Sequence, residues 1–188
     1  MTRLLLVRHA RPTENWDADP DAGLDPVGRE QAGTLVGSLG AEPPLPVLTS
    51  PLRRARETAA PLAAHWGTEP QVITAVGEIT APHVAAEERV GWLRNVLTGT
   101  WAEVDARLAA WRSALLEALG SIEHDSVVFS HFVAINTAVG SATGDARVMC
   151  FAPAHASVTE VAVEDGALRL VTRGAESDVP MPRAGGAG

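Results

Sequence analysis

Apolar-rich runs of strand length alternate with segments of helical periodicity along most of the chain. The runs lie at residues 4–7, 46–50, 70–80 and 126–132, and each leads into a turn or a helical segment. An uninterrupted apolar run such as the first is typical of a strand that is buried on both faces, as in parallel sheets. The alternation predicts an α/β fold with three α/β/α layers, in which helices flank a mostly parallel central sheet.

The polar residues between these runs carry signals for helix starts and ends. Asp25 and Pro26 have the order of an N-cap followed by a proline in the first turn, and apolar residues then recur three or four apart. A second helix is expected directly after Pro51. Residues 81–120 read as two helices that are separated near Gly99.

The C-terminal part has a different pattern. Two alternating segments, 157–163 and 167–173, flank the turn residues Glu164–Gly166 and predict a β-hairpin. From Gly174 onward the chain is rich in Gly, Pro and Ala, so residues 174–188 are expected to be a disordered tail. We therefore expect a single domain over residues 1–173.

Composition narrows the possible partners. The chain has 188 residues and a formal net charge of −8, which argues against non-specific binding to nucleic acid. No apolar stretch has membrane length and no lipidation or signal motif is found, so we expect no membrane partner. The single Cys150 excludes an intramolecular disulfide and a cysteine-based zinc cluster, which fits a cytoplasmic protein. Nothing in the composition predicts an oligomeric state.

Polar side chains with chemistry in common follow the expected strands. Arg8 and His9 follow the first strand, and Arg54 lies one helical turn after the second. Glu78 follows the third, and His131 follows the fourth. Because the carboxyl ends of parallel strands meet at one edge of a sheet, we expect these side chains to converge. Guanidinium groups match the oxygens of a tetrahedral dianion, so the pattern predicts a phosphate site.

Three arginines stand close together after the second strand, and only one of them is expected in the site. Arg53 and Glu57 are four residues apart and can pair on the outer surface of a helix. Arg54 points about 100° away from its neighbour and is free to face the strand ends. The alternative is that Arg53, Arg54 and Arg56 simply form a solvated helix face.

Two other candidates also have structural alternatives. His131 could be a core histidine whose ring nitrogens are satisfied by neighbouring groups. Glu78 could be an ordinary exposed glutamate, and Glu87 or Glu88 could instead be the carboxyl group of the site.

Four segments match, in order, the signatures of one known family. "VRHARPTEN" (7–15) corresponds to an Arg-His-Gly segment after the first strand, and "LDPVGREQA" (24–32) to a helix start that contains Gly, Gln and Ala. "SPLRRARETA" (50–59) is close to a complete Ser-x-Leu-x-Arg-Ala-x-x-Thr-Ala signature, and "VVFSHF" (127–132) carries a second His after a late strand. This set resembles the histidine phosphatase superfamily, also called phosphoglycerate mutase-like, over most of the chain.

The resemblance implies a role for each residue at the predicted edge. His9 would be the nucleophile that accepts the phosphoryl group, and Arg8, Arg54 and His131 would bind its oxygens. His131 would thus also belong to the catalytic set. Glu78 would protonate the leaving oxygen. A neutral imidazole is a good nucleophile near pH 7, which agrees with this assignment.

Further residues are expected at the edge of the site. Asn15 falls where the family often has an Asn that contacts phosphate. Arg11 and His83 are expected at the substrate rim, where Arg11 would favour a substrate with a second anionic group. No metal and no other cofactor is expected, because arginine side chains supply the positive charge.

Four positions depart from the family pattern, and two of them, Arg11 and Pro12, stand where the family commonly has Glu-Thr. Ala10 replaces the family Gly after the nucleophile, which would disfavour a loop that needs a positive φ there. Phe132 replaces the usual Gly after the second His.

The function expected from the resemblance is hydrolysis of a small phosphorylated metabolite through a phosphohistidine. One alternative is phosphoglycerate mutase-type transfer. Phosphoglycerate mutases carry a longer basic insert after the acid, whereas only Arg89 and Arg94 stand in that interval here. The other alternative is an inactive relative that serves as a binding module. Retention of the nucleophile argues against it.

Overall fold

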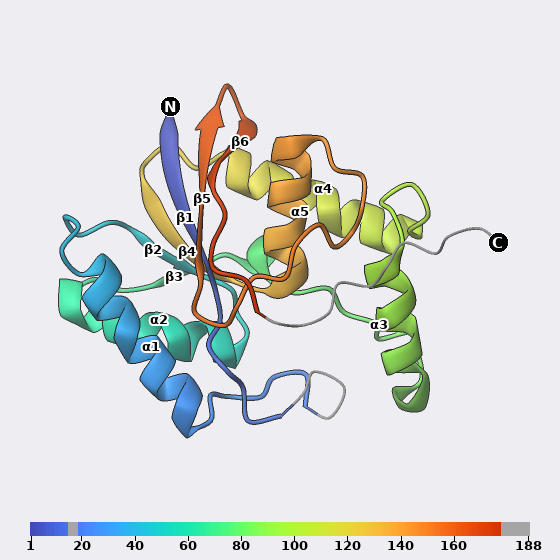
Figure 1. Ribbon diagram of the computed structural model, residues 1–188, viewed down its shortest axis with the longest axis horizontal. Coiled ribbons are helices and arrows are strands. Elements are labelled where there is room, and N and C mark those ends of the chain that lie inside the picture. The colour runs from blue at the N-terminus through green and yellow to red at the C-terminus, as the bar shows by residue number, and fades with distance from the viewer. Residues whose placement is uncertain (15–18, 178–188) are drawn as a thin grey trace.

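The structure, a computed structural model, describes residues 1–14 and 19–177. It consists of one six-stranded sheet between two layers of helices (Figure 1). In chain order the elements are β1 (Thr2–Arg8), α1 (Pro26–Leu39), β2 (Val47–Thr49), α2 (Arg53–Trp66), β3 (Gln71–Val72), the 3-10 helices η1 (Thr74–Val76) and η2 (Ala86–Glu88), α3 (Arg89–Thr98), α4 (Ala106–Gly120), β4 (Ser126–Ser130), α5 (Phe132–Thr143), β5 (Val158–Glu164) and β6 (Ala167–Thr172).

The strand order in the sheet is β3-β2-β4-β1-β5-β6. Strands β1 to β4 pair in parallel, whereas β5 is antiparallel to β1 and β6 is antiparallel to β5. Helices α1 and α2 cover one face, and α4 and α5 cover the other (Figure 1). The predicted three-layer α/β/α fold with a mostly parallel sheet is confirmed.

Strand β1 shows why the continuous apolar run predicted a central strand. Leu4 and Leu6 pack into the cluster formed with α4 and α5. Leu5 and Val7 point the other way, into the cluster formed with α1 and α2. Since alternate side chains of a strand point to opposite faces, a strand covered on both faces needs an apolar residue at every position.

Local signals placed most element ends correctly. The side chain of Asp25 accepts a hydrogen bond from the backbone N–H of Gly28 and caps α1, with Pro26 as its first residue. Helices α3 and α4 are separated after Gly99, as predicted. Asp165 and Gly166 have positive φ angles of 52° and 78° and form the tight turn between β5 and β6.

The third predicted strand is much shorter than expected. Of residues 70–80, only Gln71 and Val72 pair with β2, and the chain then turns into η1. The carbonyl oxygen of Val76 accepts a hydrogen bond of 2.7 Å from Oγ of Ser130. This bond joins the end of η1 to the end of β4. The helical segment expected from residue 81 also begins later, at Ala86.

Disorder was predicted from Gly174 onward, and this start is too early. Residues 174–177 form backbone hydrogen bonds with the segment before β5, from Ala154 N to Ala175 O at 2.8 Å and from Ser177 N to Ala152 O at 2.8 Å. The expectation of disorder is therefore wrong for these four residues. Their backbone groups find partners far away in the sequence, which composition alone does not reveal. Residues 178–188 lie outside the described residues.

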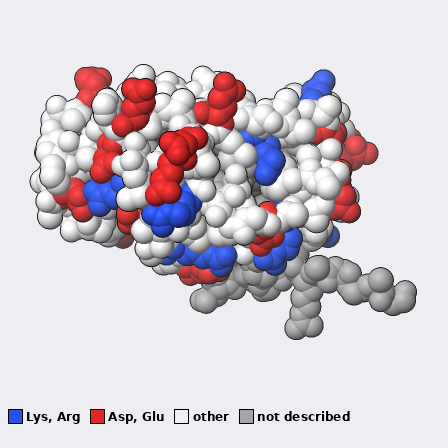
Figure 2. All heavy atoms as spheres, turned by 90° about the horizontal axis from the view of Figure 1, so that it is seen from above, with Lys and Arg blue, Asp and Glu red and all other residues white. Residues whose placement is uncertain are grey.

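Charges of both signs are interspersed on the face drawn in Figure 2, where the blue arginines lie among red acidic side chains. They form no continuous basic surface on the coloured part of this face, and the absence of a nucleic-acid partner stays a prediction. In the part of the chain that the structure describes, no helix is long and apolar enough to cross a membrane.

Candidate active site

The carboxyl ends of three parallel strands meet at the predicted edge. Arg8 at the end of β1 pairs in register with Ser130 at the end of β4, and the N–H of His9 donates to the carbonyl oxygen of Ser130 over 2.9 Å. On the other side of β4, Ser50 N donates to Phe129 O over 3.0 Å. His9 and His131 therefore stand side by side, with their ring centroids 5.2 Å apart.

Residues of the other sequence motifs hold the loop that follows β1. Arg11 N donates to Oε1 of Gln31 over 2.9 Å. A Cβ atom at Gly28 would overlap the carbonyl oxygen of Arg11, so this close approach of loop and helix α1 requires glycine. The motif residues around α1 thus act by fixing the backbone next to His9.

The same loop is attached to helix α2. The N–H of Ala10 donates to Oγ1 of Thr58 over 2.9 Å, and this hydroxyl donates to the carbonyl oxygen of Arg54 over 2.6 Å. Ala10 is fully buried and is not among the described non-glycine residues with positive φ, which are Ala156 and Asp165. The replacement of the family Gly by Ala10 is therefore compatible with this loop.

The hydrogen bond of His9 determines which ring nitrogen can act. Nδ1 lies 2.8 Å from the carbonyl oxygen of Ala10. Because a carbonyl oxygen only accepts, Nδ1 carries the ring proton and Nε2 keeps its lone pair. Burial, followed by the charges of His131, Arg54 and Arg8, holds the pKa of His9 well below its usual value. The ring is thus neutral at pH 7, with a free lone pair.

Arg8 is fixed by three neighbours. Nη1 donates to the carbonyl oxygen of Pro153 over 2.6 Å, and Nη2 donates to Nε2 of His155 over 3.0 Å. The guanidinium carbon also lies 5.0 Å from the centre of the Phe132 ring, within the range of a cation–π interaction. Burial lowers the pKa of Arg8 to about 10, so it remains a cation at neutral pH.

The structure separates the three arginines of α2 as helix geometry predicted. Arg54 is buried, lines the site and donates from Nη1 to the carbonyl oxygen of Pro20 over 2.8 Å. Arg53 forms an exposed ion pair with Glu57, with 2.6 Å between Nε and Oε1. Arg56 is exposed. Of these three arginines, only Arg54 lines the pocket that contains His9.

His131 lies deeper than the sequence suggested. It is 0% exposed and does not line the pocket, and its Nε2 lies 2.7 Å from the hydroxyl oxygen of Ser50. Burial, with the charges of Arg54 and Arg8, keeps the pKa of His131 well below its usual value. Its Nδ1 is buried without a hydrogen-bond partner, which is unusual in a folded protein.

Glu78 is held by two backbone groups. Ile79 N donates to Oε1 and Val133 N donates to Oε2, each over 3.0 Å. Burial raises the pKa of the carboxyl group, against the opposing effects of these hydrogen bonds and of Arg54 and Arg8. Glu78 therefore retains a proton to higher pH than an ordinary glutamate, which suits a general acid. The competing Glu87 and Glu88 are exposed and do not line the pocket.

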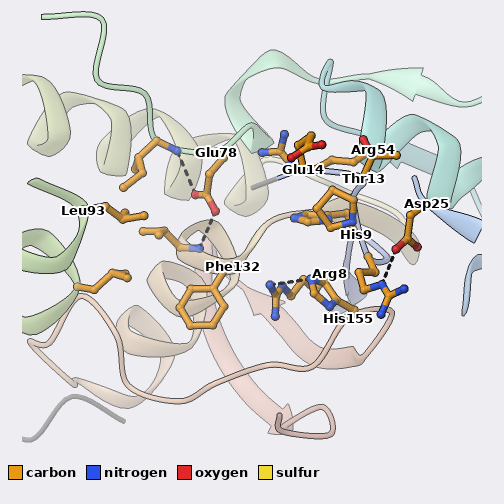
Figure 3. Close-up of a pocket in the computed structure, with 15 residues that line it drawn as sticks. Arg8, His9, Thr13, Glu14, Asp25, Arg54, Glu78, Leu93, Phe132 and His155 are labelled. Carbon is orange, nitrogen blue, oxygen red and sulfur yellow. Dashed lines mark hydrogen bonds and ion pairs between the residues drawn. The ribbon is translucent and has the colours of Figure 1, made fainter. Parts of the chain in front are cut away.

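Arg8, His9, Arg54 and Glu78 line one open pocket of about 640 Å³ (Figure 3). Figure 3 shows Glu78 between two groups of side chains, with His9 and Arg54 on one side and Leu93 and Phe132 on the other. The lining residues are Arg8, His9, Arg11, Pro12, Thr13, Glu14, Asp25, Arg54, Glu78, Ile79, Leu93, Leu97, Phe132, Val133 and His155.

His155 is a site residue that the sequence analysis missed. Its ring centroid lies 5.7 Å from that of His9, and its Nε2 accepts the hydrogen bond from Arg8. The next residue, Ala156, has a positive φ of 56° and donates its N–H to the carbonyl oxygen of Arg8 over 3.0 Å. The available signal was the position of His155 just before the first hairpin strand. An antiparallel neighbour of β1 begins where β1 ends.

The two predicted rim residues have different outcomes. Arg11 lines the pocket, where its Nε is 2.6 Å from Oδ2 of Asp25. His83 does not line the pocket. It borders a separate cavity of about 100 Å³, with its Nε2 3.9 Å from Oδ2 of Asp105. The rim assignment of His83 is therefore wrong, because the turn after Glu78 directs it toward the start of α4. Asn15 lies outside the described residues.

Metal ligands do not gather in the described part of the chain. Within residues 1–14 and 19–177, no three His, Cys, Asp or Glu side chains are placed to hold a metal ion together. Cys150 is free and buried.

Comparisons with known proteins show the family and the fold of this chain. A 125-residue segment is 32% identical to an uncharacterised protein of Mycobacterium tuberculosis, covering 60% of this chain and 62% of that protein. The fold is similar to phosphoserine phosphatase of Entamoeba histolytica, solved with 3-phosphoglyceric acid (TM-score 0.73, 21% identity, 93% of this chain and 98% of that chain). It is also similar to a mycobacterial glucosyl-3-phosphoglycerate phosphatase solved with VO3 (TM-score 0.68, 22% identity, 94% and 100%).

A phosphoglycerate mutase of Thermus thermophilus has the same fold, with a TM-score of 0.62 and 22% identity over 94% of this chain and 100% of that chain. The family model of the histidine phosphatase superfamily (branch 1) matches residues 4–176, which include the ends of β1, β2 and β4 and the loop before β5. The chain belongs to the histidine phosphatase superfamily.

Proposed function

We propose that this protein hydrolyses small phosphomonoesters through a covalent phosphohistidine on His9. The observation that carries the proposal is the position of His9 in one pocket with the guanidinium groups of Arg8 and Arg54. The lowered pKa of His9, caused first by burial, supports it. Glu78 lines the same pocket. Membership of the superfamily and the phosphatases among the structural neighbours support the proposal.

In the first step, Nε2 of His9 attacks phosphorus, a P–N bond forms and the ester P–O bond breaks. Glu78 gives its proton to the leaving oxygen, which departs as a neutral alcohol. Its raised pKa supports this role. Arg8 and Arg54 stabilise the negative charge on the phosphoryl oxygens.

In the second step, water attacks the phosphorus of the phosphohistidine. The carboxylate of Glu78 takes a proton from the water, the P–N bond breaks and its electron pair returns to Nε2 of His9. Inorganic phosphate leaves, and both side chains regain their starting protonation states. The cycle consumes one water for each ester.

The positive charge in this mechanism comes from Arg8 and Arg54, so we propose that catalysis does not require a metal ion. A chelator should leave the initial rate of phosphate release unchanged. A loss of activity that a divalent cation restores would contradict this part of the proposal.

Water is a better acceptor here than the second hydroxyl group of a phosphoglycerate. Transfer to such an anionic acceptor needs cations beyond those that hold the phosphoryl group. Arg89 and Arg94, the two cations between Glu78 and α4, do not line the pocket. This observation favours a phosphatase over a mutase.

The test is phosphate release by the wild type and by His9→Ala and His9→Asn. We expect turnover to fall by about 10³-fold or more, since both variants lack the nucleophile. Intact mass after an alkaline quench should show a phosphorylated wild type and unmodified variants. His65→Ala, on the exposed surface of α2, is the matched control. Activity of His9→Ala within tenfold of the wild type would remove His9 from this role, and an inactive wild type would favour a binding module.

A further inference from the structure

The pocket has two walls of opposite character (Figure 3). His9, Arg8 and Arg54 form the polar wall, where the phosphoryl group would bind. The other wall is made of side chains without charge or hydrogen-bonding groups, namely Ile79, Leu93, Leu97, Phe132 and Val133. The side chains of the second wall take no part in the two chemical steps. Their apolar character indicates which organic groups of a substrate can bind beside the phosphoryl group.

The apolar wall is the open edge of a packed cluster. Ile79 and Val133 belong to its buried centre, at 1% and 2% exposure. Leu93 and Leu97 are four residues apart on α3, so they share one face of the helix and pack partly buried against the same cluster. The wall is therefore supported by the core.

Glu78 places the leaving group of the substrate against this wall. Its two carboxylate oxygens accept hydrogen bonds from the backbone N–H groups of Ile79 and Val133. A leaving oxygen that takes a proton from Glu78 must therefore come close to these two residues. Their N–H groups are already used, so they offer no donors to a polar or anionic substrate group.

The described charged residues at the rim do not supply a free cation for an anionic substrate group either. Arg11 is paired with Asp25 at 2.6 Å, and Glu14 also lines the pocket. Among the described lining residues, the other cations are Arg8 and Arg54, which the phosphoryl group uses. A second anionic group would meet one paired arginine and two carboxylates. This arrangement differs from the expectation that Arg11 favours a second anion.

From these contacts we infer that the preferred substrates are phosphomonoesters of apolar alcohols, alkyl or aryl, whose organic part carries no negative charge. The inference rests on the proposed phosphatase function and adds the chemical class of its leaving group. Phosphoserine and 3-phosphoglycerate, which carry a carboxylate near the phosphoryl group, are therefore expected to be poor substrates.

The experiment compares n-alkyl phosphates from methyl to hexyl. Their leaving oxygens differ little in basicity, so the chemical step is nearly constant and kcat/KM reports binding of the alkyl chain. We expect kcat/KM to rise about 2- to 4-fold per methylene over the first few carbons. Carboxyalkyl phosphates of the same length, phosphoserine and 3-phosphoglycerate should be about 10-fold poorer or worse than the matched alkyl ester.

Variants of α3 test whether the wall causes the rise. Leu93→Ser and Leu97→Ser should each reduce the increase per methylene. Val90→Ser is the matched control, because Val90 lies on the same helix, is 49% exposed and does not line the pocket. Thermal unfolding of each variant checks the fold, and the wild-type series decides the question even if a variant does not fold.

The outcomes separate this inference from the proposed function. A flat alkyl series, or faster hydrolysis of the carboxylated esters, would overturn the apolar class while leaving the phosphatase intact. If the wild type releases phosphate from no ester faster than His9→Ala does, the phosphatase proposal itself fails.

Discussion

Arg8 donates a guanidinium N–H to His155, with 3.0 Å between Nη2 and the imidazole Nε2. Because arginine has no acceptor, Nε2 of His155 must hold a lone pair in this contact. Burial and the charges of Arg8 and Arg11 lower the pKa of His155 to about 4, so the ring is neutral at pH 7. The loop before β5 thus fixes an arginine next to His9.

The first prediction concerns this contact. His155→Ala should lower kcat/KM for an alkyl phosphate by about 10-fold or more, the effect of losing a hydrogen bond to a charged group. His155→Gln should recover part of the loss, since its amide oxygen can accept the same N–H. The exposed His124→Ala serves as control. Equal losses in the Ala and Gln variants would show that His155 acts only as packing.

A second prediction concerns stability in acid. His9, His131 and His155 have pKa values below the ordinary 6.5 in the folded protein. Below pH 6.5 the unfolded chain therefore binds more protons than the folded one, so the free energy of unfolding falls as the pH falls. The raised pKa of Glu78 acts in the opposite sense, but it is one group against three.

Urea unfolding between about pH 7 and pH 5 measures this loss. His131→Asn should make the free energy of unfolding less dependent on pH, whereas the exposed His124→Asn should leave the dependence unchanged. An unfolding free energy that is constant over this range would show that the histidines titrate normally in the folded state.

The three arginines of α2 allow a matched comparison. Arg54→Ala should lower kcat/KM by about 10²- to 10³-fold, as the loss of a group that stabilises transition-state charge does. Arg54→Lys should recover only part, because an ammonium lacks the planar fork of a guanidinium. Arg53→Ala and Arg56→Ala should remain near the wild type. A loss in Arg56→Ala comparable to that in Arg54→Ala would contradict the assignment.

Glu78→Gln separates a general acid from a structural carboxylate. An alkoxide is a poor leaving group without a proton, so alkyl ester hydrolysis should slow by about 10²-fold or more. p-Nitrophenolate leaves well unprotonated, so its ester should be little affected if phosphoenzyme formation limits the rate. Burst kinetics identify the limiting step.

Glu87→Gln and Glu88→Gln are the controls for this prediction, and both should behave as the wild type with either ester. The placement of the acid is wrong if one of them shows the dependence on leaving group and Glu78→Gln does not.

The sequence could predict those features that depend on local chain geometry. The run Leu4–Val7 is apolar at every position because both faces of β1 are covered, and it predicted the central strand. The N-cap at Asp25 lies within one helical turn of the groups it binds. The separation of Arg54 from Arg53 follows from the rotation per residue of a helix. The ordered motifs predicted that His9, Arg54 and His131 belong to one site, and the position of Glu78 at the end of the third predicted strand added it.

Other features required the tertiary structure, because their partners lie far away in the sequence. His155 reaches Arg8 only because β5 runs antiparallel to β1, and a hairpin pattern does not reveal which strand it joins. The ion pair with Asp25 places a carboxylate beside Arg11, which the sequence assigned to the substrate, and this partner could not be predicted from the sequence. The sequence likewise could not show that His83 lies beside Asp105, at the start of α4, and not at the pocket.

The apolar wall shows the same division. Leu93 and Leu97 have the spacing of an ordinary core stripe, and the sequence could not distinguish a fully covered stripe from one that borders a pocket. Hydrophobic periodicity reports which face of a helix avoids water, whereas the neighbours of that face depend on all the layers packed around it. The motifs of this chain predicted the polar residues of the site, and only the packing of α3 against Ile79 and against residues of α4 and α5 decided what lies beside them.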